Sequence, residues 1–111
     1  MDNFSETIDR YITLNGRELY ESAQRGERHG GIFRDAEIKT RIRLEKSIAS
    51  HTAQVAEHAD KLRHPEKYDA GWTRKTDRQR EGLLIKWKKD LKRNAEQAKI
   101  EIEVWKERFD S

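Results

Sequence analysis

The histidine whose neighbours best suit acid–base chemistry is His29, in the segment Arg28-His29-Gly30-Gly31. A histidine can act as general acid or base, and an adjacent arginine can stabilise a phosphate. The two glycines permit backbone conformations that let a substrate approach closely. We therefore take His29 as a candidate catalytic acid or base and Arg28 as a candidate phosphate clamp. The motif is short, and an ordinary turn between helices is the alternative explanation.

The other three histidines lie on a predicted helix or at its end. His51 and His58 share one helical face but lie about 10 Å apart. That distance is too long for two ligands of one metal unless another helix contributes. We expect both to be hydrogen-bonded at a helix interface, and His64, before Pro65, to interact with the helix C-terminus. His64 would assist phosphodiester chemistry only if His29 approached it.

Metal and cofactor chemistry is not expected. The chain has no cysteine, which excludes disulfides and thiolate ligands. It has no His-Glu-x-x-His pattern and no cluster of carboxylates beside the histidines.

Positive charge gathers in the second half of the chain. Residues 64–94 carry ten Lys or Arg and five Asp or Glu, a net +5, whereas the whole chain carries +3. Such a ridge of cations can bind phosphates, and Trp72 could add base stacking. A solvated helix face with ion pairs is the alternative. The candidate nucleic-acid-binding residues are Arg74, Lys75, Arg78, Lys86, Lys89 and Arg93.

Helices must position these groups, because apolar residues recur at spacings of three and four. We predict one domain of 111 residues with a helix over 4–24, a Gly-rich loop over 25–34, a helix over 35–63, a connector over 64–76 and a helix over 77–109. Asn3 with Glu6, and Thr76 with Gln79, resemble capping boxes. The clearest apolar stripe is Leu84, Trp87, Leu91, Ala95, Ala98, Ile102, Trp105 and Phe109.

These elements predict an all-α fold. The two long helices should form an antiparallel hairpin, with the N-terminal helix covering part of the apolar stripe. The composition, 33% apolar and 41% charged, suits amphipathic helices that bury one face. No apolar run is long enough for a membrane span, and the N-terminus has no signal-peptide pattern.

Several segments together resemble a known group of proteins. They are Arg28-His29-Gly30-Gly31, Lys46-Ser47-Ile48 with His51 and His58, residues 61–68 (KLRHPEKY) and residues 82–87 (GLLIKW). The pattern, over roughly residues 25–95, resembles the C-terminal effector modules of bacterial polymorphic toxins of the Rhs and contact-dependent inhibition types. This resemblance implies a small toxin module that is delivered by a larger secreted parent chain, acts in the cytoplasm and is neutralised by an immunity protein. It supplies no reaction and no catalytic residue.

The leading functional hypothesis is therefore a toxin-type effector that acts on nucleic acid or on a target that carries it. If it is an enzyme, a metal-independent nuclease is the expected class. Two alternatives stay open. One is a non-enzymatic helical interaction protein, such as a phage-encoded inhibitor or adaptor. The other is an immunity protein, although an acidic surface would suit that role better than the basic middle of this chain.

Overall fold

The computed structural model describes residues 6, 8–12 and 15–110, and within them the chain forms helices and no strands. The elements are α2 (Gly16–Gln24), α3 (Gly30–Ile38), α4 (Arg41–Arg63), α5 (Pro65–Tyr68), the short 3-10 helix η1 (Trp72–Arg74) and α6 (Asp77–Phe109). This confirms the all-α fold class. None of the described helices is long and apolar enough to cross a membrane.

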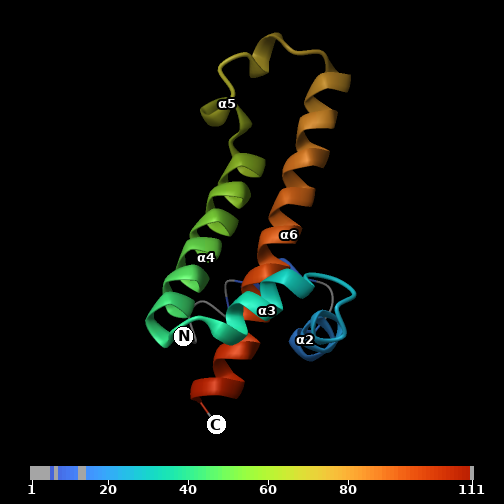
Figure 1. Cartoon of the computed structure of the whole chain (residues 1–111). Helices are drawn as coiled ribbons and strands as arrows, with labels where there is room; N and C mark the ends of the chain where they lie inside the picture. Colours follow the sequence, from blue (N-terminus) through green and yellow to red (C-terminus); the bar gives the residue numbers. More distant parts are fainter. Residues whose placement is uncertain (1–5, 7, 13–14, 111) are drawn as a thin grey trace.

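The helices α4 and α6 form the predicted hairpin, with α5 and η1 at the turn (Figure 1). The molecule is elongated and measures 51 × 26 × 20 Å. Helix α6 begins where the sequence predicts. The Thr76 hydroxyl accepts a hydrogen bond from the Gln79 backbone N–H, and the Gln79 side chain accepts one from the Thr76 N–H. This reciprocal capping box satisfies two donors that a helix start leaves free.

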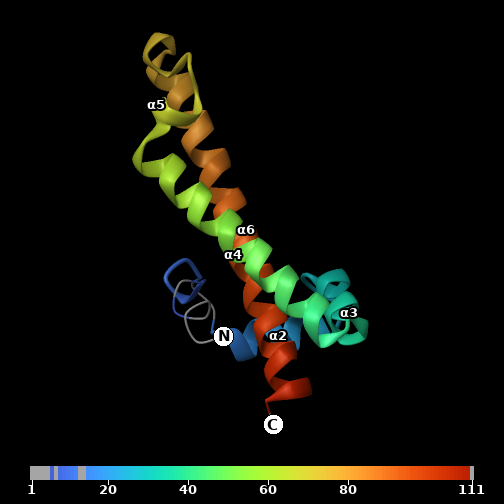
Figure 2. The same cartoon turned by 90° about the vertical axis from the view of Figure 1, so that its left-hand side faces the viewer.

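The two halves of α6 have different surroundings. The half nearest the turn buries one side against α4, through Trp87 and Leu91. The C-terminal half is enclosed by α2, α3 and α4 (Figures 1 and 2), so that residues on almost every side of it are buried. The predicted stripe is buried at Trp87, Leu91, Ala95, Ala98, Ile102 and Trp105, and half-buried at Leu84 and Phe109.

The predicted continuous helix over residues 4–24 is wrong. Residues 6, 8 and 9 are helical, but a turn follows at residues 10 and 11. Helix α2 begins only at Gly16, where the Asn15 side chain caps it by accepting a hydrogen bond from the Glu18 N–H at 2.8 Å. The predicted cap at Asn3 lies outside the described residues.

Gly16 lies against the ends of the Lys99 and Glu103 side chains of α6. A Cβ at this position would overlap Lys99 Cε and Glu103 Oε1. Both atoms are at the ends of flexible side chains, which would have to shift to accommodate a larger residue at the start of α2.

The predicted loop over 25–34 and helix over 35–63 also need correction. The loop is shorter, because Gly30 and Gly31 are the first residues of α3 rather than a turn. Helix α3 ends at Ile38, and α4 starts after Thr40, whose hydroxyl accepts from the Arg43 N–H at 3.3 Å. The break is not visible in the apolar pattern, since α3 buries its own face against α2 and α6.

The α4–α6 seam gives the first testable expectation. Leu91→Asp should destabilise the protein by about 4 kcal/mol, because it removes a buried leucine and places a carboxylate in the seam. The matched control is Lys92→Asp, one residue along on the exposed face, which should cost less than about 1 kcal/mol. Urea denaturation followed by circular dichroism measures both. Equal midpoints for the two variants would show that the seam is assigned to the wrong face.

Candidate nucleic-acid interface and histidine–carboxylate pairs

We call residues 64–93, which comprise α5, η1 and the first half of α6, the hairpin tip. A polar network fixes α5 to the end of α4. The Tyr68 hydroxyl donates to Asp60 Oδ2 at 2.5 Å, and Lys67 Nζ donates to the same oxygen at 3.0 Å. The hydrogen bond from Tyr68, followed by that from Lys67, lowers the pKa of Asp60 below its usual value. The same bond to Asp60 raises the pKa of Tyr68. Tyr68 is thereby held in one place.

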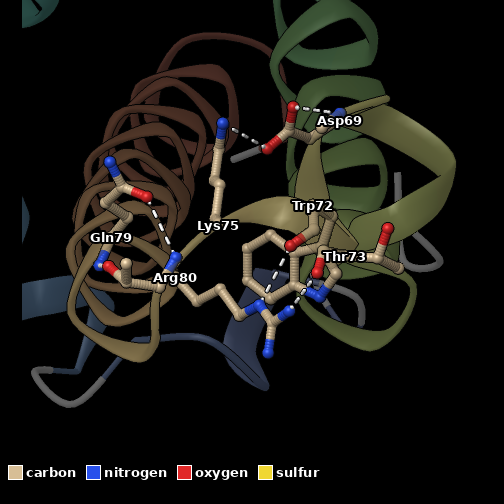
Figure 3. A network of polar contacts seen from close by, with 8 residues as sticks. Asp69, Trp72, Thr73, Lys75, Gln79 and Arg80 are labelled. Carbon is tan, nitrogen blue, oxygen red and sulfur yellow. Dashed lines mark hydrogen bonds and ion pairs between the residues drawn. The ribbon is translucent and has the colours of Figure 1, made fainter.

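A second network fixes η1 to α6 (Figure 3). Arg80 donates from Nε to the Trp72 carbonyl at 2.9 Å and from its terminal nitrogen to the Thr73 carbonyl at 2.8 Å. Its guanidinium carbon also lies 5.8 Å from the centre of the Trp72 ring. The Trp72 ring stacks on Trp87, with centroids 6.1 Å apart. Trp72 therefore already has an aromatic and a cationic neighbour, so its first role is to order the connector.

The cations of the hairpin tip fall into two groups. The first group has four members in ion pairs: Lys67 with Asp60 of α4 at 3.0 Å, Lys75 with Asp69 at 3.3 Å, Arg80 with Asp77 at 3.7 Å, and Arg93 with Asp90 at 3.1 Å. The second group is exposed and has no ion pair among the described residues. We call these six residues the unpaired tip cations: Arg74, Arg78, Lys86, Lys88, Lys89 and Lys92.

Four of the six sequence-predicted nucleic-acid-binding residues belong to this second group. Arg74, Arg78, Lys86 and Lys89 are exposed and available to an external anion. Lys75 and Arg93 are instead paired with aspartates. The exposed cations without ion pairs thus run from η1 along α6 and include Lys88 and Lys92, which are not among the six predicted residues.

A cavity of about 460 Å³ opens within the hairpin tip. Its lining combines the two anchored networks and the first turns of α6, through Tyr68, Asp69, Lys75, Gln79, Leu83 and Trp87. We call it the tip cavity. A second hollow, of about 350 Å³, lies at the α3–α4 junction and is lined by Asp35, Ile38, Lys39, Thr40 and Arg43. Of these two hollows, the tip cavity is the one associated with the unpaired tip cations. Its lining residues alternate with those cations along the sequence.

His29 lies on a buried carboxylate. Its Nε2 is 3.1 Å from Oε1 of Glu96, a residue only 1% exposed, and a terminal nitrogen of Arg28 is 2.7 Å from the same oxygen. Arg28 Nε also donates a hydrogen bond to His29 Nε2 at 3.3 Å. Nε2 can serve only one of these contacts at a time: without a proton it accepts from Arg28, and with a proton it donates to Glu96. In the second tautomer Nδ1 carries no proton and could accept one from a substrate.

The arrangement bears on both predicted roles. His29 has φ +61°, in the left-handed region, and precedes α3 directly. A buried carboxylate that fixes a histidine tautomer is a common support for a general base. Arg28, however, already pairs with Glu96, so its guanidinium is partly committed before any phosphate arrives. Both roles stay predictions.

His51 forms a second pair of the same kind. Its Nδ1 lies 2.5 Å from Oε1 of Glu101, and the Ser47 hydroxyl donates to Oε2 of that carboxylate, also at 2.5 Å. Glu101 is 1% exposed. Ser47 and His51 are one turn apart on α4, so both reach the carboxylate on α6. The serine bonds to the glutamate and not to the histidine, so these three residues do not form a nucleophile–base–acid relay.

The remaining histidines are separate from these pairs. His58 is half-buried, and its Nδ1 has no hydrogen-bond partner among the described residues. Burial, with a smaller effect from Lys61, lowers the pKa of His58 below its usual value. His64 is exposed and lies 3.9 Å from Glu66. Within the described part of the chain it forms no hydrogen bond with His29, and no three metal-ligating side chains gather there.

Glu96 and Glu101 are residues of the candidate site that the sequence analysis did not single out. Both lie off the apolar stripe of α6, where a glutamate is expected to face water. One signal was available: Ile100 and Val104 are apolar although they too lie off that stripe, and both are buried. Apolar residues on a second face indicate that the C-terminal half of α6 is covered on more than one side.

No known protein family, curated protein or solved structure matches this chain. Its function must therefore be inferred from the residues and their geometry.

The contact between His51 and Glu101 leads to a second prediction. His51→Ala should destabilise the protein by about 2 to 4 kcal/mol, since it leaves a buried carboxylate with only Ser47 as partner. His64→Ala removes an exposed imidazole at the C-terminal end of α4 and should change stability by less than about 0.5 kcal/mol. Urea midpoints at neutral pH measure the difference. If both variants behave alike, the Glu101 pair does not stabilise the fold.

Proposed function

We propose that this protein binds nucleic acid through the hairpin tip, as the nucleic-acid-directed effector module of a polymorphic toxin. One observation carries the binding part of the proposal. The six unpaired tip cations are exposed and have no acidic partner among the described residues, although acidic residues are frequent in the chain. Cations left without partners repel one another, and that cost is recovered when phosphates bind and release counterions.

The polymorphic-toxin part of the proposal is supported by the sequence resemblance and by the small all-α architecture. If the module cleaves its target, His29 is the acid or base we propose. In the tautomer in which Nε2 donates to Glu96, Nδ1 would take a proton from the attacking hydroxyl. Arg28, beside it, would bring positive charge to the phosphate that is cleaved.

Binding through the tip predicts a steep dependence on salt. Affinity for single-stranded RNA or DNA should fall as salt rises, with a log–log slope of about −0.7 for each phosphate contacted. Reversing three unpaired tip cations together, Arg78→Glu, Lys86→Glu and Lys89→Glu, should weaken binding by about 100-fold, because each exposed pairing of a cation with a phosphate contributes roughly 1 kcal/mol. Fluorescence anisotropy with a labelled oligonucleotide measures both effects.

The matched control reverses three exposed cations outside the tip, Arg34, Arg43 and Lys46. It changes the net charge by the same amount but leaves the proposed interface intact. The decrease in affinity should therefore be much smaller. Equal decreases in the two triple variants would mean that only net charge matters, and absence of binding at low salt would remove the proposal.

The nuclease hypothesis predicts that expression stops growth and that His29→Asn restores it. Asparagine tolerates the left-handed backbone of this position and keeps an N–H donor, but it cannot act as a base. Loss of general acid–base catalysis costs about 100- to 10,000-fold in rate. His64→Asn is the control and should stay toxic. The hypothesis would be contradicted if the His29→Asn variant still arrested growth while circular dichroism showed an unchanged helix content. His29 would then have only a structural role.

A specific observation favours the second candidate, a helical interaction protein. Ile38 and Ile42 are 82% and 66% exposed at the α3–α4 junction, and Ile38 lines the hollow there. Exposed apolar side chains beside a concavity are typical of protein docking sites. Expression that leaves growth unaffected, together with absence of nucleic-acid binding, would favour this class.

A further inference from the structure

We propose that the tip cavity is a base-recognition pocket that takes an unstacked guanine from a single-stranded nucleic acid. This inference rests on the proposed function, because the unpaired tip cations would bring the strand to the cavity. The inference extends the proposed function in two ways. It specifies that the nucleic acid is a single strand rather than a duplex, and it names the preferred base.

The cavity has the size and the mixed lining of a small-molecule site. Its volume of about 460 Å³ lies within the range of about 300 to 1,000 Å³ that such sites have. Tyr68 and Leu83 give it an aromatic and an apolar wall against which a base can pack, and the small exposed part of Trp87 completes the lining. The walls are held in place, since Trp72 stacks on Trp87 and Asp60 binds the Tyr68 hydroxyl.

Asp69 supplies an acceptor that is not fully used. Its Oδ1 accepts a hydrogen bond from the Gly71 N–H at 3.2 Å. Its Oδ2 is buried and lies 3.3 Å from Lys75 Nζ, as Figure 3 shows, but it has no aligned hydrogen bond among the described residues. A buried carboxylate oxygen in this state is stabilised when a donor reaches it. A ligand with N–H groups would provide that donor.

Lys75 supplies a donor beside the acceptor. An ammonium group has three N–H donors and no acceptor, so Lys75 can keep its ion pair with Asp69 and still donate to a carbonyl oxygen. The cavity therefore presents an acceptor and a donor side by side against an aromatic wall. This pattern fits the edge of a nucleobase rather than an aliphatic ligand.

Among the common bases, guanine matches this edge best. It carries two neighbouring donors, N1–H and the N2 amine, followed by the O6 acceptor. The two donors can meet the Asp69 carboxylate while O6 meets Lys75. Adenine and cytosine offer one amine donor beside a ring acceptor, and uracil offers one N–H between two carbonyls. Only an unpaired base exposes this edge, which is why the proposed substrate is single-stranded.

The test compares four eight-residue RNAs: oligouridine, and oligouridine with one central guanosine, inosine or adenosine. Guanosine should raise the affinity about tenfold over adenosine, which corresponds to about 1.4 kcal/mol. Inosine, which lacks the N2 amine, should fall between them. Asp69→Asn should remove the guanosine preference, so that the affinities for the guanosine and adenosine RNAs become equal. The affinity for oligouridine should rise slightly, because Lys75 loses its ion pair. Anisotropy of labelled RNA measures the affinity.

Asp77→Asn is the matched control. It also removes one negative charge next to a tip cation, Arg80, but Asp77 does not line the cavity. It should keep the preference for guanosine. Lys75→Gln is a second test of the pocket and should weaken that preference, so the inference stays testable if Asp69→Asn disturbs the connector.

The outcomes separate the two proposals. Absence of binding to every RNA at low salt overturns the proposed function. Salt-dependent binding with equal affinity for guanosine and adenosine overturns the pocket and leaves the proposed function standing. A guanosine preference that survives in both Asp69→Asn and Lys75→Gln also overturns the pocket.

Discussion

The C-terminal half of α6 is enclosed by three helices, and this enclosure buries two carboxylates that must then find partners. Glu96 and Glu101 are each 1% exposed. A buried charge is tolerated only when it is paired and hydrogen-bonded. Glu96 takes Arg28 and His29 from the segment before α3, while Glu101 takes Ser47 and His51 from α4. The positions of α3 and α4 relative to α6 are thus fixed by charge pairing as well as by apolar burial.

The same constraint gives the two ends of the molecule different distributions of charge. Histidines and carboxylates satisfy one another in the enclosed half, so most of its ionisable groups serve the fold. The hairpin tip has fewer covering elements, and its cations are too numerous for its aspartates. Positive charge is therefore left at the end of the hairpin that lies away from α2 and α3 (Figure 1). A binding surface at this end can change without disturbing the core.

The connector between the long helices is ordered by polar contacts more than by burial. Arg80 binds two carbonyls of η1, Asp60 binds Tyr68, and Trp72 stacks on Trp87. A connector built in this way lines one side of the open tip cavity. The ordered walls are what a recognition pocket requires, because a preorganised site loses less entropy when its ligand binds.

The sequence by itself determined the long helices and the apolar seam. Spacings of three and four place Leu91, Ala95 and Ala98 on one face of any helix that contains them. The Thr76–Gln79 capping box fixes the start of α6. Local composition also determined which segment is basic. The breaks at Asn15 and Thr40 were less visible, since a side chain that can cap a helix start is also tolerated inside a helix.

Only the tertiary structure decided which charges are free and which are buried. Glu96 and Glu101 look like solvent-facing residues until three helices close around α6. Whether Arg74 or Arg93 is available to a phosphate depends on which aspartate lies near it in space. Ion pairing, burial and cavities arise from distances between residues far apart in the chain, and periodicity along one helix carries no information on those distances.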